Sequence, residues 1–288
     1  MTSSETSPAR PQLVINADDF GYFPEVTEGI SDCVAAGNVT ALSILVHEGT
    51  QPDLFVAARH LAEAHPVDIG VHLNFSHGKP LTQPLADALK SGHFGSKFSM
   101  LRHLALGPVT VEMVEREWDT QIQVVRENGI TPAFLNSHEH LHMFPLLYAA
   151  FLRLAERHRI RWIRFCTPEW APRGSSGHWL RTAVFATTSL LSRRPPQFSW
   201  GELLGIAPSG RLDLAYLKRQ LKTLKPGIVY ELMCHPGKGI PALAGNLTRY
   251  HDWDAEYACL SRPDTSRIIA EAGAHLTSFT GAHQTHAS

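Results

Sequence analysis

The sequence predicts an α/β protein, a distorted (β/α) TIM-like barrel with about seven parallel strands. Short apolar, β-rich runs alternate with helical patterns along the chain, and strands separated by helices usually pair in parallel. Seven such units without a second core fit one barrel, because single barrels commonly exceed about 250 residues and the chain has 288. Reactive side chains also fall at the predicted strand ends, where barrel enzymes keep their active sites.

The elements follow from periodicity and from the residues that begin or end them. Strands are expected at 13–17, 40–46, 67–73, 133–136, 160–166, 227–234 and 275–279. Helices are expected at 26–36, 54–64, 111–126, 145–158, 212–224 and 255–272. Thr110 is a candidate N-cap, Gly129 ends a helix and Pro145 begins one. Segments 78–108 and 168–208 lack clear periodicity, and insertions of this kind often cover a barrel's site or bind substrate.

We expect a single domain over residues 11–280, a disordered arm at 1–10 and a flexible tail at 281–288. The arm lacks the basic start and apolar run of a secretory signal, and no apolar stretch reaches the roughly 18 residues of a membrane span. With 26 basic and 27 acidic residues, no basic surface points to nucleic acid or an anionic membrane. Four widely spaced cysteines without a CxxC pair predict buried free thiols in a reducing cytoplasm.

The candidate catalytic residues share one position, the carboxyl end of a predicted strand. They are Asp18, Asp19, His72, His138, His140, His142, Arg164 and His235. Because these ends share one face of a barrel, the side chains are expected to converge. Each has a structural alternative when taken alone, since Asp often caps helices and a lone His often packs in a core. The agreement of several strands favours a site.

Three imidazoles in five residues, those of His138, His140 and His142, suit a divalent metal or a polar substrate pocket. The segment also matches HExxH, the zinc-protease motif, which requires the interior of a helix. An apolar strand runs straight into the segment, and Pro145 favours a helix that begins after it. We therefore reject the protease interpretation and retain a surface cluster without function as an alternative.

One Asp and two His around a metal leave positions open for water and a substrate oxygen, as hydrolysis requires. Asp18 would take a proton from the water, and the metal would polarise a carbonyl. His235, presented by the turn at Pro236, would protonate a leaving amine, although it could instead cap or pack. Carboxylate and imidazole suit Zn²⁺ and, less exclusively, Mg²⁺ or Mn²⁺. No GxGxxG, Walker A or GxSxG motif occurs.

Five blocks of this sequence resemble the YdjC-like carbohydrate deacetylases. They are NADDFG at 16–21, GNVT at 37–40, GVHLN at 70–74, NSHEHLHMFP at 136–145 and CHPG at 234–237. The resemblance runs in order over about residues 12–280. It implies a barrel related to NodB-type polysaccharide deacetylases and metal-dependent removal of acetyl from an N-acetylated sugar, which in this family is a mono-, oligosaccharide or glycoconjugate. It also implies that the chain can form a homodimer.

The resemblance assigns roles residue by residue. It implies one divalent ion, Zn²⁺ or Mg²⁺, on Asp19, His72 and His138, with Asp18 as the base and His235 as the acid. It places substrate binding on His140, His142, Arg164 and Asn74. The two histidines could instead support the ligands, and Arg164 could orient the catalytic Asp, as in the NodB relatives. Glu139 stands where the family often has Gln or His.

Two other functions stay open. A metal-dependent phosphoesterase would use more carboxylate ligands, and the strand ends offer few besides Asp18 and Asp19. A non-catalytic sugar-binding protein on the same scaffold would have lost a ligand or the base, and none is missing. Segment 168–208 matches nothing in the family, so the natural sugar is not assigned.

Overall fold

The computed structural model describes residues 10–167, 194–206, 208–239 and 251–286, without the side chains of 283–286. Within these residues the strands are β1 (Gln12–Phe20), β2 (Ala41–Leu45), β3 (Asp68–Leu73), β4 (Phe134–Ser137), β5 (Trp162–Ile163), β6 (Glu202–Leu204), β7 (Val229–Cys234) and β8 (His275–Leu276). All pairings are parallel, and the sheet has the order β5-β4-β3-β2-β1-β7-β6, with β8 beside the start of β1.

The sheet curls until its two edges meet. Ser199, which precedes β6, forms a parallel bridge with Trp162 of β5. The backbone N–H of Ile163 donates to the Ser199 carbonyl at 2.9 Å, and the N–H of Ser199 donates to the Arg161 carbonyl at 2.8 Å. The result is the distorted α/β barrel that the alternating pattern predicts.

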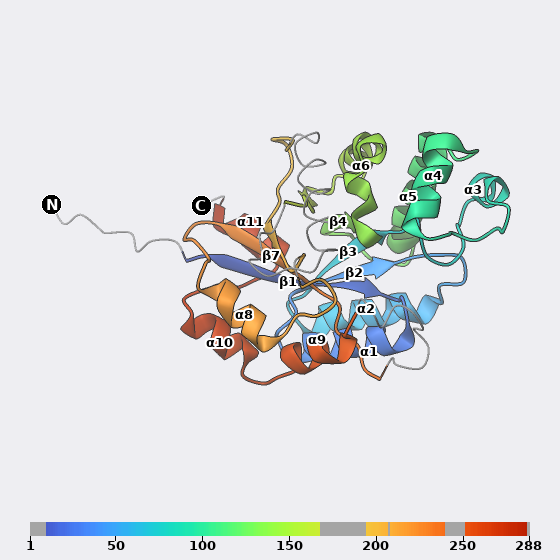
Figure 1. Cartoon of the computed structure of the whole chain (residues 1–288). Coiled ribbons are helices and arrows are strands. Elements are labelled where there is room, and N and C mark those ends of the chain that lie inside the picture. The colour runs from blue at the N-terminus through green and yellow to red at the C-terminus, as the bar shows by residue number, and fades with distance from the viewer. Residues whose placement is uncertain (1–9, 168–193, 207, 240–250, 287–288) are drawn as a thin grey trace.

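Helices cover the outside of the sheet (Figure 1). The described helices are α1 (Pro24–Ala35), α2 (Pro52–Ala64), α3 (Gln83–Ala88), α4 (Lys97–Leu106), α5 (Val111–Glu127), the 3₁₀ turn η1 (His138–Met143), α6 (Pro145–Arg157), α8 (Leu214–Leu221), α9 (Trp253–Leu260), α10 (Thr265–Glu271) and α11 (Phe279–His286). As expected, Thr110 caps α5 by accepting a bond from the Met113 N–H. None of the described helices is both long and apolar enough for a membrane span.

Side chains inside the barrel change from apolar to polar along the strands. At the amino end a small cluster fills the interior: Val14, Ala41, Phe134, Trp162 and Val229, closed by Phe279 and Ala282 of α11. Because successive strand residues point to opposite faces, the next inward positions lie two residues further on. These positions are all polar and buried: Asn16, Ser43, His72, Asn136, Arg164 and Glu231. The fold therefore delivers a buried polar layer to the carboxyl ends of the strands.

Gly70 lets the apolar layer close beneath this polar one. A Cβ atom at Gly70 would lie 2.5 Å from the Phe134 ring, so any side chain there would displace the ring. Phe134 in turn contacts Phe279, with ring centroids 4.6 Å apart. The inward position before His72 is thus kept empty to make room for an aromatic ring from the neighbouring strand.

The structure corrects several boundaries. The prediction of one continuous helix at 255–272 is wrong, because the structure has two helices there, α9 and α10, separated around Pro263. Proline lacks an N–H and disfavours the helical conformation in the residue before it. The strand expected at 160–166 pairs only over Trp162–Ile163. The sequence analysis missed β6, α3 and α4, which lie in the two segments without periodicity.

The structure describes the chain ends in part and all four cysteines. The expected arm at 1–10 lies outside the described residues except for Arg10, as does 168–193 of the tryptophan-rich segment. Much of the expected flexible tail is helical, because α11 runs to His286. The four cysteines are buried free thiols, as predicted.

Candidate metal centre and active site

A β-bulge at the end of β1 allows the side chains of two adjacent residues, Asp18 and Asp19, to face the polar layer inside the barrel. The pairing of β1 with β2 shifts register between Ala17 and Phe20, and Asp19 has a φ of 69°. In a regular strand Asp18 would point inward and Asp19 outward. A bulge re-aims side chains, and Asp tolerates the left-handed conformation better than most residues. This local geometry explains how both carboxylates reach the polar layer.

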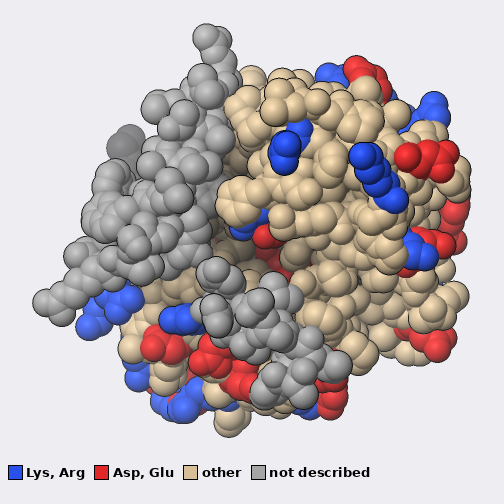
Figure 2. Space-filling view, turned by 45° about the vertical axis from the view of Figure 1, so that its right-hand side comes forward, with Lys and Arg blue, Asp and Glu red and all other residues tan. Residues whose placement is uncertain are grey.

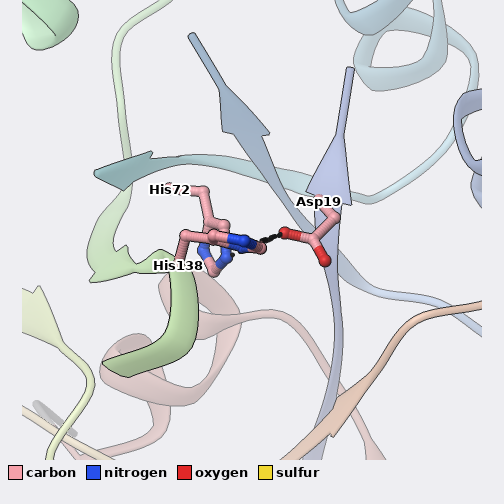
Figure 3. A group of neighbouring side chains, drawn as sticks. All are labelled: Asp19, His72 and His138. Atoms are coloured by element: carbon pink, nitrogen blue, oxygen red, sulfur yellow. Dashed lines mark hydrogen bonds and ion pairs between the residues drawn. The ribbon is translucent and has the colours of Figure 1, made fainter. Parts of the chain in front are cut away.

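Asp19, His72 and His138 form a compact group at the carboxyl ends of β1, β3 and β4 (Figure 3). The Asp19 Oδ1 atom lies 3.1 Å from His72 Nε2 and 2.8 Å from His138 Nδ1. One potential ligand atom from each residue lies within 4.8 Å of the others. The two imidazoles converge on the carboxylate from different strands. Three side chains far apart in the sequence thus come together as expected.

The hydrogen bonds of His72 leave its Nε2 atom facing Asp19. The Asn136 amide donates through Nδ2 to Asp18 Oδ1 at 3.0 Å, so its Oδ1 faces His72 Nδ1 at 2.7 Å. An amide oxygen only accepts, and His72 therefore donates from Nδ1. In the neutral ring, Nε2 is then an acceptor that faces another acceptor, Asp19 Oδ1. A cation between the two atoms resolves this conflict, so the residues fit a divalent ion.

Asp18 lies behind this group as part of a buried ionic network. Its two oxygens accept bonds from Arg164 Nη1 at 2.5 Å and Nη2 at 2.9 Å, and Oδ1 also accepts from Ser43 Oγ at 3.0 Å. Arg164 Nε donates to Glu231 Oε1 at 2.9 Å. The Arg164 side chain is fully buried, and carboxylates on two sides compensate the charge of its guanidinium, as a buried arginine requires. Arg164 therefore orients Asp18.

Burial and charge act in opposite directions on these carboxylates. Burial alone raises the pKa of Asp18, but the Arg164 guanidinium and the nearby His72 lower it well below its usual value. The pKa of Asp19 is also held well below its usual value, since the charge and hydrogen bond of His138 outweigh burial. The pKa of His138 rises in return, because Asp19 outweighs burial. Both carboxylates are thus ionised at neutral pH.

His235 follows β7, the strand that pairs with β1. The His235 side chain is buried. The turn that follows it packs closely against α1, because a Cβ atom at Gly29 would lie 2.6 Å from the Gly237 Cα. Glu256 of α9 accepts a bond from the His235 N–H, and its Oε2 lies 3.7 Å from His235 Nδ1. Burial lowers the pKa of His235, but Glu256, Asp19 and Asp18 raise it to about 9. His235 is therefore protonated at neutral pH.

The other predicted site residues lie around this centre in different ways. His142 is fully buried, and its two ring nitrogens contact Ser137 Oγ at 2.6 Å and the Arg164 carbonyl at 3.1 Å. Asn74 is fully buried and folds the loop after β3. His140 is half-buried in the η1 turn with a φ of 58°. The substrate-binding roles of these residues stay predictions, and the positions of His142 and Asn74 favour support of neighbouring groups.

Sequence reasoning missed the residues that support the predicted ones. Ser43, Asn136 and Glu231 contact Asp18, His72 or Arg164 inside the barrel, and Glu256 contacts His235. The first three were detectable as single polar residues on the inward alternation of apolar strands. Glu256 had no such signal, because a glutamate on a helix is usually exposed.

Figure 2 shows the face of the molecule toward which the strands run. In a hollow near the centre of this face, acidic atoms lie beside a basic side chain, and the described residues on the right of the hollow are mainly uncharged. Ionised carboxylates at the bottom of a hollow, with imidazoles beside them, are an arrangement typical of a metal-dependent hydrolytic site.

Comparison with known proteins agrees with this geometry. The model of the YdjC-like protein family matches residues 12–271. The chain belongs to the YdjC-like family. A carbohydrate deacetylase of Mus musculus is 32% identical over 297 residues, which cover 93% of each chain. A carbohydrate deacetylase of Geobacillus stearothermophilus is 28% identical and covers 92% of this chain and 96% of its own.

A solved structure shows the same fold. It is that of a candidate cellobiose-phosphate cleavage protein from Enterococcus faecalis V583, with a TM-score of 0.69, 24% identity and coverage of 94% of this chain and 98% of that one. At this level of identity the likeness concerns the fold alone. A solved structure therefore has the same barrel fold as this chain.

Proposed function

We propose that this protein is a metal-dependent hydrolase that removes the acetyl group from an N-acetylated amino sugar and releases acetate. The observation that carries the proposal is the convergence of Asp19, His72 and His138 beside the arginine-bound Asp18, with His235 held near Glu256. The relatives that cover nearly the whole chain are carbohydrate deacetylases, which supports an acetylated sugar as substrate.

Asp19, His72 and His138 would hold the ion. When bound, a divalent ion polarises the acetamide carbonyl and lowers the pKa of a nearby water. The residues around it accept an ion with one negative carboxylate and two neutral imidazoles, a set that suits Zn²⁺ and also allows Mg²⁺ or Mn²⁺.

Asp18 and His235 would move the protons. Water adds to the acetyl carbon while Asp18 accepts a proton from it, the C–N bond breaks, and His235 donates a proton to the departing amine. Arg164 lowers the pKa of Asp18 and keeps it ionised, so that it is able to accept a proton. His235 is suited to the donor role because Glu256 keeps it protonated above neutral pH.

Arg164, Asn136 and Glu256 would act as positioning residues. Arg164 holds both oxygens of Asp18, and Asn136 connects Asp18 with His72. The Asn136 side chain thereby helps to orient Asp18 and fixes the tautomer of His72. We also retain the cytoplasm as the proposed compartment, on the basis of the free cysteines, and a homodimer as the proposed assembly, on the basis of the resemblance to the family.

Acetate release from N-acetylglucosamine and its short oligomers, measured with and without a chelator, tests this function. The proposal expects release that stops on chelation and returns with added metal. Chelator-insensitive release would remove the metal from the mechanism. Hydrolysis of phosphoesters in place of acetamides would favour the phosphoesterase alternative, and sugar binding without any turnover would favour a non-catalytic protein.

A further inference from the structure

The ring of His251, just before α9, lies against the ring of the proposed acid, His235. The two ring centroids are 5.1 Å apart, and the ring planes meet at 74°. The His251 ring also stacks on the ring of Trp253, with centroids 5.1 Å apart and 22° between the planes. His251 therefore connects a tryptophan of α9 with the side chain that would protonate the leaving amine.

The tryptophan under His251 is joined to the turn that carries His235. Trp253 is the first residue of α9 and is 4% exposed. Its carbonyl accepts a bond from the Gly237 N–H at 3.2 Å, and the backbone at Gly237 packs against Gly29 of α1. The platform on which the His251 ring rests is thus attached, through the main chain, to the turn after β7.

Glu256 alone does not set the direction of the His235 ring. Its carboxylate accepts a bond from the His235 backbone N–H, which fixes the main chain. The ring atom Nδ1 of His235 lies 3.7 Å from Glu256 Oε2, which is longer than a hydrogen bond, and it has no hydrogen-bond partner among the described residues. Rotation of a histidine ring about its Cβ–Cγ bond is only weakly restricted by the side chain itself. The ring of His251 supplies a packing contact that restricts this rotation.

The contact between His251 and His235 is one of ring packing. Nδ1 of His251 is also buried, without a hydrogen-bond partner in the part of the chain that the structure describes. Aromatic rings favour steep, edge-to-face pairs with centroids about 4.5–7 Å apart, as observed here. Burial and the charge of His235 lower the pKa of His251 to about 3, so His251 adds no second positive charge. A neutral ring from another residue can therefore take its place.

We infer that His251 is a positioning residue, whose ring holds the His235 imidazole in the direction from which it donates a proton to the departing amine. The inference rests on the proposed deacetylase function and adds to it a residue that acts through His235. Loss of the ring lets the His235 imidazole turn away from the amine. The proton-transfer step then slows, while substrate binding is largely retained.

The first test measures acetate release from short oligomers of N-acetylglucosamine by zinc-loaded variants. His251→Ala should lower kcat about 10- to 100-fold, which is part of the roughly 10²- to 10⁴-fold that a positioned acid contributes, with little change in KM. His251→Phe keeps a ring and should recover most of this loss. His65→Ala is the matched control, because His65 is also partly exposed but follows α2 at the amino end of the barrel, and its kcat should equal that of wild type. An unchanged kcat in His251→Ala, or a His251→Phe as slow as His251→Ala, would overturn the inference.

A double-mutant cycle shows whether His251 acts through His235. In a His235→Ala background, the further change His251→Ala should not lower kcat again, because the group that His251 positions is gone. The same fold-loss in both backgrounds would give His251 a role independent of His235 and contradict the inference.

Crystal structures of wild type, His251→Ala and His251→Phe separate this inference from the proposed function, since they require no turnover. The His235 ring is expected in one conformer in wild type and His251→Phe, and in more than one in His251→Ala. This result supports the positioning role even if no sugar releases acetate and the deacetylase proposal fails. A single, unmoved His235 ring in His251→Ala would refute the positioning role while leaving deacetylation intact.

Discussion

Asn136→Ala tests the link between the proposed base and the proposed metal ligands. The substitution removes the acceptor 2.7 Å from His72 Nδ1 and the donor 3.0 Å from Asp18 Oδ1, so the His72 tautomer is no longer fixed. Partners of this kind are worth about 10- to 100-fold in metal affinity, or about 1.4–2.7 kcal/mol. Asp18 keeps its bonds from Arg164 and Ser43, and the polar layer should otherwise persist.

Zinc titration calorimetry in the presence of a competing chelator measures the effect directly. We expect zinc to bind Asn136→Ala about 10- to 100-fold more weakly than wild type. Asn38→Ala is the matched control, because Asn38 is equally buried and makes three hydrogen bonds to the Leu260 and Arg262 carbonyls and the Ser266 N–H, outside the metal-ligand group. Equal zinc affinity in wild type and Asn136→Ala, or an equal loss in the control, would refute the reasoning.

Three further predictions concern the proposed base, the proposed acid and the apolar layer at the amino end of the barrel. Asp18→Asn should lower kcat by about 10²- to 10⁴-fold, the usual contribution of a positioned base, while zinc binding by calorimetry persists; full activity would remove Asp18 from its role. Because Glu256 raises the pKa of His235 to about 9, kcat/KM should fall as the pH rises through that value and His235 loses its proton. Glu256→Gln should shift this fall toward neutral pH. A pH profile that does not shift would show that Glu256 does not control the pKa of His235. Gly70→Ala, whose Cβ would lie 2.5 Å from the Phe134 ring, should cost about 1–3 kcal/mol in urea unfolding, and Phe134→Leu in that background should recover part of the loss if the clash is the cause.

The parts of the fold that sequence alone predicts are those with strong local signals. The alternation of apolar strands with amphipathic helices indicated a parallel barrel, and Thr110 and Pro145 marked the starts of α5 and α6. The break at Pro263 was also present in the sequence, but the apolar pattern on both sides of it concealed two short helices. Short elements such as β6 had no signal, because three residues cannot establish a period.

The candidate site divides in the same way. The convergence of Asp19, His72 and His138 followed from their positions at strand ends, since parallel strands share one carboxyl face. The β-bulge that turns Asp19 inward depends on the register between two strands and on a positive φ at Asp19. Neither feature can be recognised in a single sequence. The partnership of His235 with Glu256 likewise arises from the packing of α9 against the turn after β7 and could be found only in three dimensions.

Anomalous X-ray diffraction at the zinc edge, from crystals of the zinc-loaded protein, tests the proposed metal centre most directly. One strong peak is expected within ligand distance of Asp19 Oδ1, His72 Nε2 and a ring nitrogen of His138. A peak at another place, or none among these three side chains, would contradict the proposed site and the hydrolytic chemistry built on it.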